Sequence, residues 1–317
     1  MAKKVISVVG ATGVQGRSVI DALLKDKEYA IRAITRNPQS EKAKALAALG
    51  VEVAQADLND LDSLIKAFKG SSAIYGATDF FEPFAKHGPT KAMEVEVVQG
   101  TNIAKAAAAT ETLEHYIWST LPDGRKVSNG KFIVPHFEAK NDIDRYIKSD
   151  KALLAKTSFL WITFYASNFG FPMFTPYYIP TAGKYIELQD APASTPIRSI
   201  GDPKVNIGLF VKAILAQPEK TLGGKYVLAH VEDTNAGEML QTWARVNNKK
   251  AEYVQIDTNT FHNIWPMWAE EMGTMMRLWD WAGLEKSWSG EDYLTKDDLN
   301  VREGLISVAD ALTGMEF

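Results

Sequence analysis

A glycine-rich segment near the N-terminus has the residue types and spacing of a phosphate-binding loop. It reads Gly10-Ala-Thr-Gly-Val-Gln-Gly16, after the β-branched run Val5–Val9 and before a helical pattern. Glycines in such a turn allow a tight bend and close approach of the backbone to a pyrophosphate, and the helix N-terminus supplies amide donors. The segment therefore predicts a dinucleotide site; the alternative is an ordinary glycine-rich turn. The residues expected to contact the dinucleotide are Gly10, Thr12, Gly13, Val14, Gln15 and Gly16.

The residue after the second predicted strand distinguishes the two nicotinamide dinucleotides. An acid there binds the ribose 2′-hydroxyl of NAD(H), whereas an arginine accommodates the 2′-phosphate of NADP(H). The sequence has Arg36 and no acid, which favours NADP(H) because a guanidinium pairs with phosphate in bidentate fashion. A solvated surface arginine is the alternative. Asp57, followed by Leu58, would line the adenine or cap a helix.

The elements that must position these residues alternate between strands and helices. Short apolar runs predict strands at 5–9, 30–34, 51–54, 73–77, 116–119 and 159–165, with helical patterns between them. Such alternation implies a parallel sheet with right-handed crossovers. We predict an α/β fold, a Rossmann doubly wound parallel sheet over residues 1–170. Tyr165 and Asn168 would end the sixth strand near the nicotinamide.

The second half, residues 171–317, is predicted to form a smaller and mostly helical cap that binds a substrate or a partner. Residues 171–203 are rich in proline and aromatics and are predicted to be mostly loop, and residues 204–230 to return to the Rossmann sheet. Five of the eight tryptophans lie in 261–288. Tryptophan and methionine at helical spacing indicate either core or an apolar pocket. The predicted pocket residues are Phe81, Trp265, Trp268 and Glu270, and Glu270 and Glu271 would face either the pocket or solvent.

Composition excludes several classes of function. A net charge of −4 over 317 residues gives no general attraction to nucleic acids or anionic membranes. The absence of cysteine rules out disulfides, thiolate metal sites and a cysteine nucleophile, and the five histidines lack metal-ligand spacing. No apolar run suits a membrane span or a secretory signal. We expect a cytoplasmic protein, or a nuclear one if it is a regulator, without a metal, a direct nucleic-acid partner or a membrane.

Five segments together resemble the NmrA-like family, an atypical branch of the short-chain dehydrogenase/reductase superfamily. The resemblance covers residues 1 to about 170 well and continues more loosely to the C-terminus. It implies bound NADP(H), with Thr78 and Phe80 beside the cofactor, although Phe80 and Phe81 taken alone fit a core equally well. The segments are Gly10–Gly16, Thr35–Pro38, Gln55–Leu58, Thr78–Phe81 and Pro135–Lys140.

The superfamily's catalytic residues are a serine and a Tyr-x-x-x-Lys pair. By resemblance, Ser119 takes the serine position and helps to polarise a carbonyl, and Lys140 takes the lysine position and holds the cofactor ribose. The tyrosine position holds His136. Histidine suits acid–base chemistry near neutral pH, so His136 would donate the proton, or it would merely begin the helix that carries Lys140 on the same face.

Two functions remain open, because the family includes both enzymes and cofactor-binding regulators. The first is an NADP(H)-dependent enzyme for an apolar, aromatic small molecule, by reduction or, in secondary metabolism, by a condensation or cyclisation in the same pocket. The second is a redox sensor or transcriptional co-regulator that binds NADP(H) and a protein partner without turnover. The missing tyrosine favours the sensor, whereas an aromatic pocket with Ser119 and Lys140 favours the enzyme, to which the prediction leans.

Overall fold

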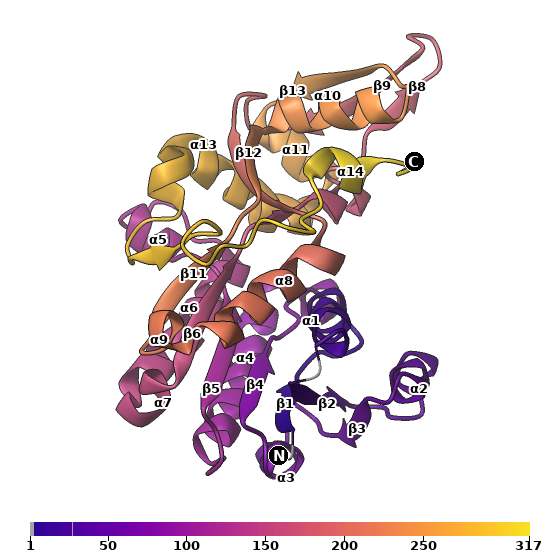
Figure 1. The fold of residues 1–317 in the computed structure, drawn as a ribbon. Coiled ribbons are helices and arrows are strands. Elements are labelled where there is room, and N and C mark those ends of the chain that lie inside the picture. Colours follow the sequence, from indigo (N-terminus) through magenta and orange to yellow (C-terminus); the bar gives the residue numbers. More distant parts are fainter. Residues whose placement is uncertain (1–2, 27) are drawn as a thin grey trace.

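A single parallel sheet forms the centre of the computed structural model, which describes residues 3–26 and 28–317 (Figure 1). All of its neighbouring strands pair in parallel, so the predicted α/β Rossmann class is confirmed. The order across the sheet is β14 (Tyr293–Leu294), β11 (Lys225–Ala229), β6 (Thr157–Ile162), β5 (His115–Thr120), β4 (Ala73–Gly76), β1 (Lys4–Val8), β2 (Tyr29–Thr35) and β3 (Glu52–Gln55).

The strand order turns around at β1, and this fixes where a ligand can bind. β1 pairs with β2 on one side and with β4 on the other, so the connections that leave β1 and β4 diverge to opposite faces. In open α/β sheets the crevice at such a point, beyond the carboxyl ends of the strands, is the usual ligand site. The central strands β4, β5 and β6 are buried at every residue, as expected for apolar strands covered on both faces.

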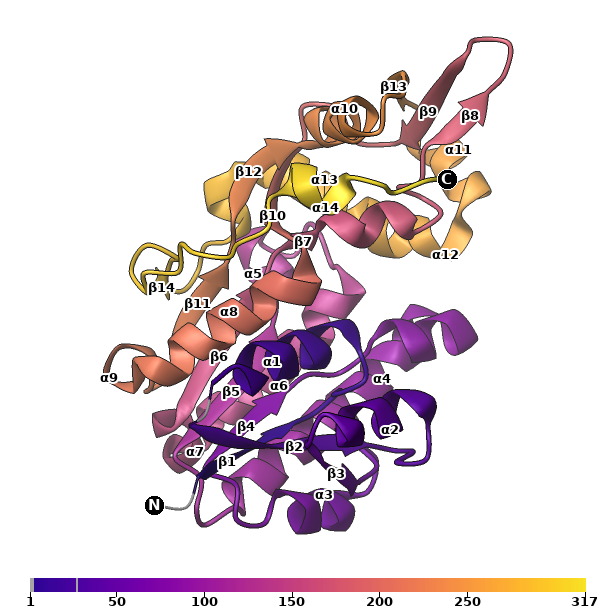
Figure 2. The same cartoon turned by 45° about the vertical axis from the view of Figure 1, so that its right-hand side comes forward.

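Helices cover both faces of the sheet and enclose two apolar cores. α1 (Val14–Leu24), α2 (Glu41–Ala48) and α8 (Pro203–Ala216) cover one face; α3 (Leu61–Phe68), α4 (Phe81–Ala108) and α6 (Pro135–Ser149) cover the other (Figure 2). α1 and α8 approach closely at Gly208, where a Cβ would lie 2.1 Å from the Ser18 carbonyl oxygen. α4 is bent at Gly88, whose φ of 78° separates a short first segment from the long remainder.

The cap lies beyond the carboxyl ends of the strands and is less helical than predicted (Figures 1 and 2). One of its sheets has the order β12 (Glu232–Asn235), β10 (Pro196–Gly201), β7 (Phe164–Tyr165), and the other β13 (Ala251–Gln255), β9 (Lys184–Gln189), β8 (Tyr177–Ile179). The prediction that residues 171–203 are mostly loop missed the strands β8, β9 and β10, which lie there. These strands are short and contain polar residues, and β8 and β9 are also partly exposed, so they lack the apolar runs that revealed the main sheet.

The remaining elements connect the sheet to the cap and build the cap's helical part. Among the described residues, no helix combines the length and the apolar character needed to cross a membrane. The elements are α5 (Gly124–Val127), α7 (Lys151–Ala155), the 3₁₀ turn η1 (Ala166–Gly170), α9 (Pro218–Thr221), α10 (Ala236–Val246), α11 (Thr258–Ile264), α12 (Pro266–Trp268), the π-helical turn η2 (Ala269–Gly273), α13 (Thr274–Ser287) and α14 (Val308–Leu312).

Candidate cofactor and active site

A cavity of about 810 Å³ lies at the carboxyl ends of the parallel strands, between the sheet and the cap. Most of the site residues predicted from the sequence border it. Those residues are Gly10, Thr12, Gly13, Val14, Gln15, Gly16, Arg36, Leu58, Thr78, Phe80, Phe81, Ser119, His136, Lys140, Tyr165 and Asn168. The predicted residues that do not border it are Asp57, Trp265, Trp268 and Glu270.

The glycine loop has the form that a pyrophosphate requires. Gly10 has a φ of 67°, and the Gly13 N–H donates to its carbonyl oxygen at 2.9 Å. A Cβ at Gly16 would lie 2.3 Å from that same oxygen, so only glycine permits this packing of α1 against the loop. Within the described chain, no side chain caps the N-terminus of α1, which leaves its first amide groups available to a phosphate.

Gln15 ties this loop to three strands. Its Oε1 accepts hydrogen bonds from the Tyr75 hydroxyl at 2.6 Å and the Ser119 hydroxyl at 2.8 Å, and its Nε2 donates to the Tyr165 oxygen at 2.8 Å. Burial raises the pKa of both tyrosines, so both remain protonated phenols at neutral pH. The Ser119 hydroxyl is therefore directed at Gln15, whereas the family resemblance implied a hydroxyl that polarises a carbonyl.

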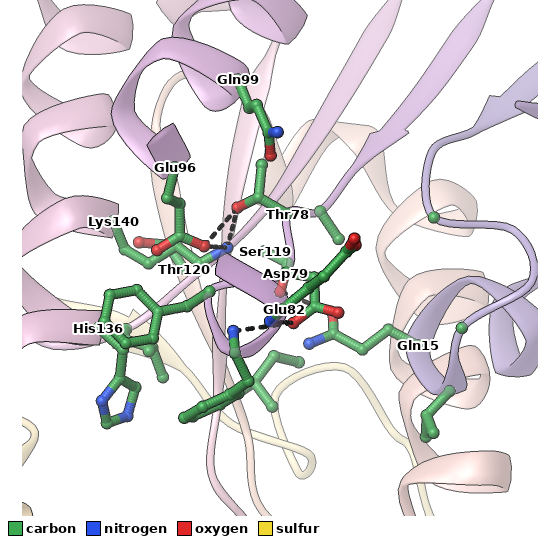
Figure 3. Close-up of a pocket in the computed structure, with 18 of the residues that line it drawn as sticks. Gln15, Thr78, Asp79, Glu82, Glu96, Gln99, Ser119, Thr120, His136 and Lys140 are labelled. Atoms are coloured by element: carbon green, nitrogen blue, oxygen red, sulfur yellow. Dashed lines mark hydrogen bonds and ion pairs between the residues drawn. The ribbon is translucent and has the colours of Figure 1, made fainter. Parts of the chain in front are cut away.

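Lys140 is held by a buried carboxylate that the sequence analysis missed. Its Nζ donates to Thr78 Oγ1 at 2.6 Å and lies 3.2 Å from Glu96 Oε1, and the Thr78 hydroxyl donates to the same carboxylate oxygen at 2.7 Å (Figure 3). The ammonium also lies 4.8 Å from the centre of the Trp118 ring, within cation–π range. Glu96 has no exposed surface, and its charge offsets the cost of burying the lysine.

His136 is paired with a second buried carboxylate, from the cap. Its Nδ1 contacts Glu271 Oε1, and its backbone N–H donates to the same oxygen at 3.3 Å. Because a carboxylate accepts, Nδ1 carries the proton in this pair, and Nε2 is the nitrogen left for a ligand. Glu271 is fully buried, and its Oε2 has no partner among the described residues.

The acid that contacts His136 is thus Glu271, which does not itself border the cavity, and the prediction of Glu270 as a pocket residue was wrong. Glu270 is exposed, and the π-helical turn η2 directs the next side chain inward. A π-helical turn departs from the 3.6-residue period of an α-helix, so helical spacing alone could not choose between the two acids.

Aromatic and methionine side chains form the apolar wall, but the wall differs from the predicted one. Phe81 lies on it and packs against Phe171, with ring centroids 5.8 Å apart. Trp268 stacks behind Phe81 at 5.9 Å, and Trp265 packs on Phe261 at 5.0 Å, away from the cavity. Besides Phe171, the cap residues that border the cavity are Met272, Met275, Trp279 and Trp288.

Arg36 borders the cavity and is 63% exposed. Its Nη2 pairs with Glu82 Oε2 at 2.8 Å, and this hydrogen bond, with a second from Lys86, holds the pKa of Glu82 below its ordinary value. Asp57 accepts hydrogen bonds from the backbone and side chain of Asn59, so it shapes the turn before α3. The N-cap of that helix is Asp60, so the helix-cap alternative for Asp57 was wrong, and its contact with the adenine stays a prediction.

Comparison with known proteins places the chain in a family. Residues 2–297 match the sequence model of the NmrA-like family. The chain belongs to this family. An NmrA-like family domain-containing protein of Dictyostelium discoideum is 32% identical over 272 residues, which are 81% of this chain and 82% of the relative. The NmrA-like family domain-containing oxidoreductase hkm9 of Aspergillus hancockii is 35% identical over 167 residues, 52% of this chain and about half (48%) of that relative.

Solved structures show that the NmrA-like fold extends over almost the whole chain. NmrA, a negative transcriptional regulator crystallised with NADP, has a TM-score of 0.78 at 20% identity and covers 99% of this chain and 96% of its own. Triphenylmethane reductase of Citrobacter sp., crystallised with NADP(H), has a TM-score of 0.68 at 22% identity and covers 97% of this chain and 98% of its own. Because a regulator and a reductase share this fold, fold alone does not decide the function.

Proposed function

We propose that this NmrA-like protein is an NADP(H)-dependent oxidoreductase that reduces an apolar, aromatic small molecule. One observation carries the proposal: a continuous cavity joins the glycine loop to an aromatic- and methionine-walled space in which His136 is backed by buried Glu271. A regulator that only detects the cofactor needs the loop but has no use for an apolar space with a positioned acid–base group.

The residues present fit NADP(H). The loop at Gly16 leaves room for backbone close to a pyrophosphate, the uncapped N-terminus of α1 offers amide donors, and Arg36 offers a guanidinium for the 2′-phosphate. Lys140, fixed by Glu96 and Thr78, presents a cation to the ribose side of the site. When bound, the reduced nicotinamide supplies a hydride. The cofactors named for NmrA and triphenylmethane reductase support this assignment.

His136 supplies the proton that must accompany the hydride. When a carbonyl carbon accepts a hydride, its oxygen gains a negative charge and takes a proton from Nε2 of the imidazolium. Glu271 keeps the proton on Nδ1, fixes the ring and stabilises the imidazolium before transfer. The neutral ring then regains a proton from water. Ser119 has no step here, because its hydroxyl is bound to Gln15.

The walls determine which molecules this site accepts. Phe81, Phe171, Met272, Met275 and Trp279 all line the cavity, and their apolar side chains suit a flat, apolar molecule. Exclusion of water strengthens the interaction of the His136–Glu271 pair with the developing charge on the substrate.

Single-turnover kinetics test the role of His136. Protein loaded with NADPH is mixed with aromatic carbonyls, imines and quinones, and the decay of reduced-nicotinamide absorbance is followed. We expect His136→Ala to slow the decay by roughly 10²–10⁴-fold, the usual contribution of a general acid, and His262→Ala, away from the cavity, to leave it unchanged. Unchanged rates in both variants would remove His136 from the mechanism.

The alternative is a regulator that binds NADP(H) and a protein partner without turnover. It is supported by the histidine in place of the usual tyrosine and by the hydrogen bond that occupies Ser119. A protein that binds NADPH but consumes none with any acceptor, and that captures a partner only in one redox state of the cofactor, would favour this function. Conversion of a substrate with no net oxidation would indicate the repurposed condensation or cyclisation.

A further inference from the structure

Arg36, the residue proposed to bind the 2′-phosphate of NADP(H), is already paired with a carboxylate. Glu82, in the first turn of α4, lies between two cations: its Oε2 is 2.8 Å from Arg36 Nη2, and its Oε1 is 3.0 Å from Lys86 Nζ and 3.4 Å from Arg36 Nη1. All three side chains border the cofactor cavity and are at least 39% exposed, so solvent and a ligand can reach them.

Hydrogen bonds hold the backbone on both sides of this ion pair. The Glu82 backbone N–H donates to Asp79 Oδ1 at 3.3 Å, in the same turn in which the Phe81 N–H donates to that oxygen at 2.9 Å (Figure 3). On the facing side, the Arg36 carbonyl oxygen accepts a hydrogen bond from Gln55 Nε2 at 3.2 Å, which fixes the backbone that carries the guanidinium.

The two cofactors interact with this arrangement in opposite ways. A phosphate carries more negative charge than a carboxylate and offers three acceptor oxygens, so it competes with Glu82 for Arg36 and for Lys86. A ribose 2′-hydroxyl cannot displace the Glu82 carboxylate from its two cations, but it can donate a hydrogen bond to that carboxylate. In NAD(H)-binding proteins, the acid that contacts the 2′-hydroxyl usually follows the second strand. Here the nearby carboxylate is that of Glu82, which follows β4.

We propose, on the basis of the cofactor site proposed above, that Glu82 is a built-in counter-ion that sets the preference between NADP(H) and NAD(H), and that Lys86 is a second cation for the 2′-phosphate. Glu82 weakens NADP(H) binding, because it must leave Arg36 and Lys86, and it supports NAD(H) binding by accepting a hydrogen bond from the 2′-hydroxyl. The chain therefore prefers NADP(H) less strongly than Arg36 alone would dictate.

Equilibrium titrations of the full chain with NADPH and with NADH, followed by reduced-nicotinamide fluorescence, test this role. We expect Glu82→Gln to lower the Kd for NADPH by roughly 2–5-fold, as for loss of one exposed ion pair, and to raise the Kd for NADH. Lys86→Met should raise the Kd for NADPH several-fold, flatten its dependence on salt, and leave the Kd for NADH within about twofold.

A matched ion pair in the same helix provides the control. Lys91 and Glu94 are 2.7 Å apart beyond the bend at Gly88, and neither borders the cavity, so Glu94→Gln and Lys91→Met should leave both Kd values unchanged. An unchanged NADPH:NADH ratio in Glu82→Gln, or weaker NADPH binding, would overturn the counter-ion role while the cofactor assignment stands. Failure of the wild-type chain to bind either cofactor would overturn the proposed function and the counter-ion role together.

Discussion

Asp144 should make the protein less stable as the pH rises from about 4 to about 7, and Asp144→Asn should remove that loss. This carboxyl lies on α6 under the site, fully buried, and accepts hydrogen bonds from Trp118 Nε1 at 2.9 Å and the Tyr226 hydroxyl at 3.1 Å. The Trp118 ring in turn contacts the Lys140 ammonium. Burial raises the pKa of Asp144 to about 7, against which the hydrogen bonds and the Lys148 charge act only in part.

The direction of the effect follows from which state holds the proton. Between pH 3.8 and about 7 the carboxyl of the unfolded chain is ionised while that of the folded chain stays protonated, so raising the pH favours unfolding. Each unit of difference between the folded and unfolded pKa of Asp144 is equivalent to about 1.4 kcal/mol. The stability lost by pH 7 is therefore at most about 4 kcal/mol. The stability that protonated Asp144 contributes is fully present below the pKa of the unfolded chain. It is lost as the pH rises to the pKa of Asp144 in the folded protein.

Urea unfolding at several pH values across this range measures the effect. The amide that Asp144→Asn introduces offers an acceptor and donors, like the protonated acid. The variant should therefore match the wild type near pH 4 and exceed its free energy of unfolding by up to about 4 kcal/mol near pH 7. Asp142→Asn changes an exposed position of the same helix, so its free energy of unfolding should depend on pH as that of the wild type does. The reasoning fails if the stability of Asp144→Asn depends on pH as that of the wild type does, or if the variant is less stable at every pH. Either result would mean that Asp144 is ionised in the folded protein.

Three further substitutions test the glycine loop, a helix contact and a buried histidine. Gly16→Ala should abolish NADPH binding in a fluorescence titration, because its Cβ would lie 2.3 Å from the Gly10 oxygen; binding at wild-type affinity would refute the loop's role. Gly208→Ala, with its Cβ 2.1 Å from the Ser18 oxygen, should lower the free energy of unfolding by about 1–3 kcal/mol in urea yet leave NADPH binding intact at temperatures where the protein is folded. Burial lowers the pKa of His115 to about 4, so the wild type should lose up to about 3 kcal/mol as the pH falls from 6.5 to about 4. In urea titrations, His115→Gln should not show that loss of stability. If the variant loses as much free energy of unfolding as the wild type over this pH range, the lowered pKa of His115 is contradicted.

Most of the main sheet could be predicted from sequence because its central strands are short apolar runs between helical patterns, whereas the two-residue edge strand β14 was missed. Ala73–Gly76 and His115–Thr120 are buried at every residue, so pattern and structure coincide there. The cap strands could not be predicted in this way. Lys184–Gln189 is half-buried and pairs with residues 251–255, a long-range contact for which local sequence holds no signal.

The site was predictable where motifs are local and unpredictable where it depends on contacts between distant elements. The loop from Gly10 to Gly16 is one continuous segment, and Lys140 follows His136 by one helical turn. Glu96 and Glu271, in contrast, each lie close to another acid in a helical stretch, and only the packing of α4 and the cap against α6 shows which acid reaches Lys140 or His136.

Isotope transfer tests the proposed oxidoreductase function most directly. The purified protein is incubated with NADPH carrying deuterium at nicotinamide C4, with each stereoisomer used separately, and with an aromatic acceptor, and the product is analysed by mass spectrometry. We expect one stereoisomer alone to deliver deuterium to the product carbon, with transfer lost in Gly16→Ala and strongly slowed in His136→Ala. Tight binding of NADPH with no deuterium in any product would contradict the account and leave a cofactor-binding regulator.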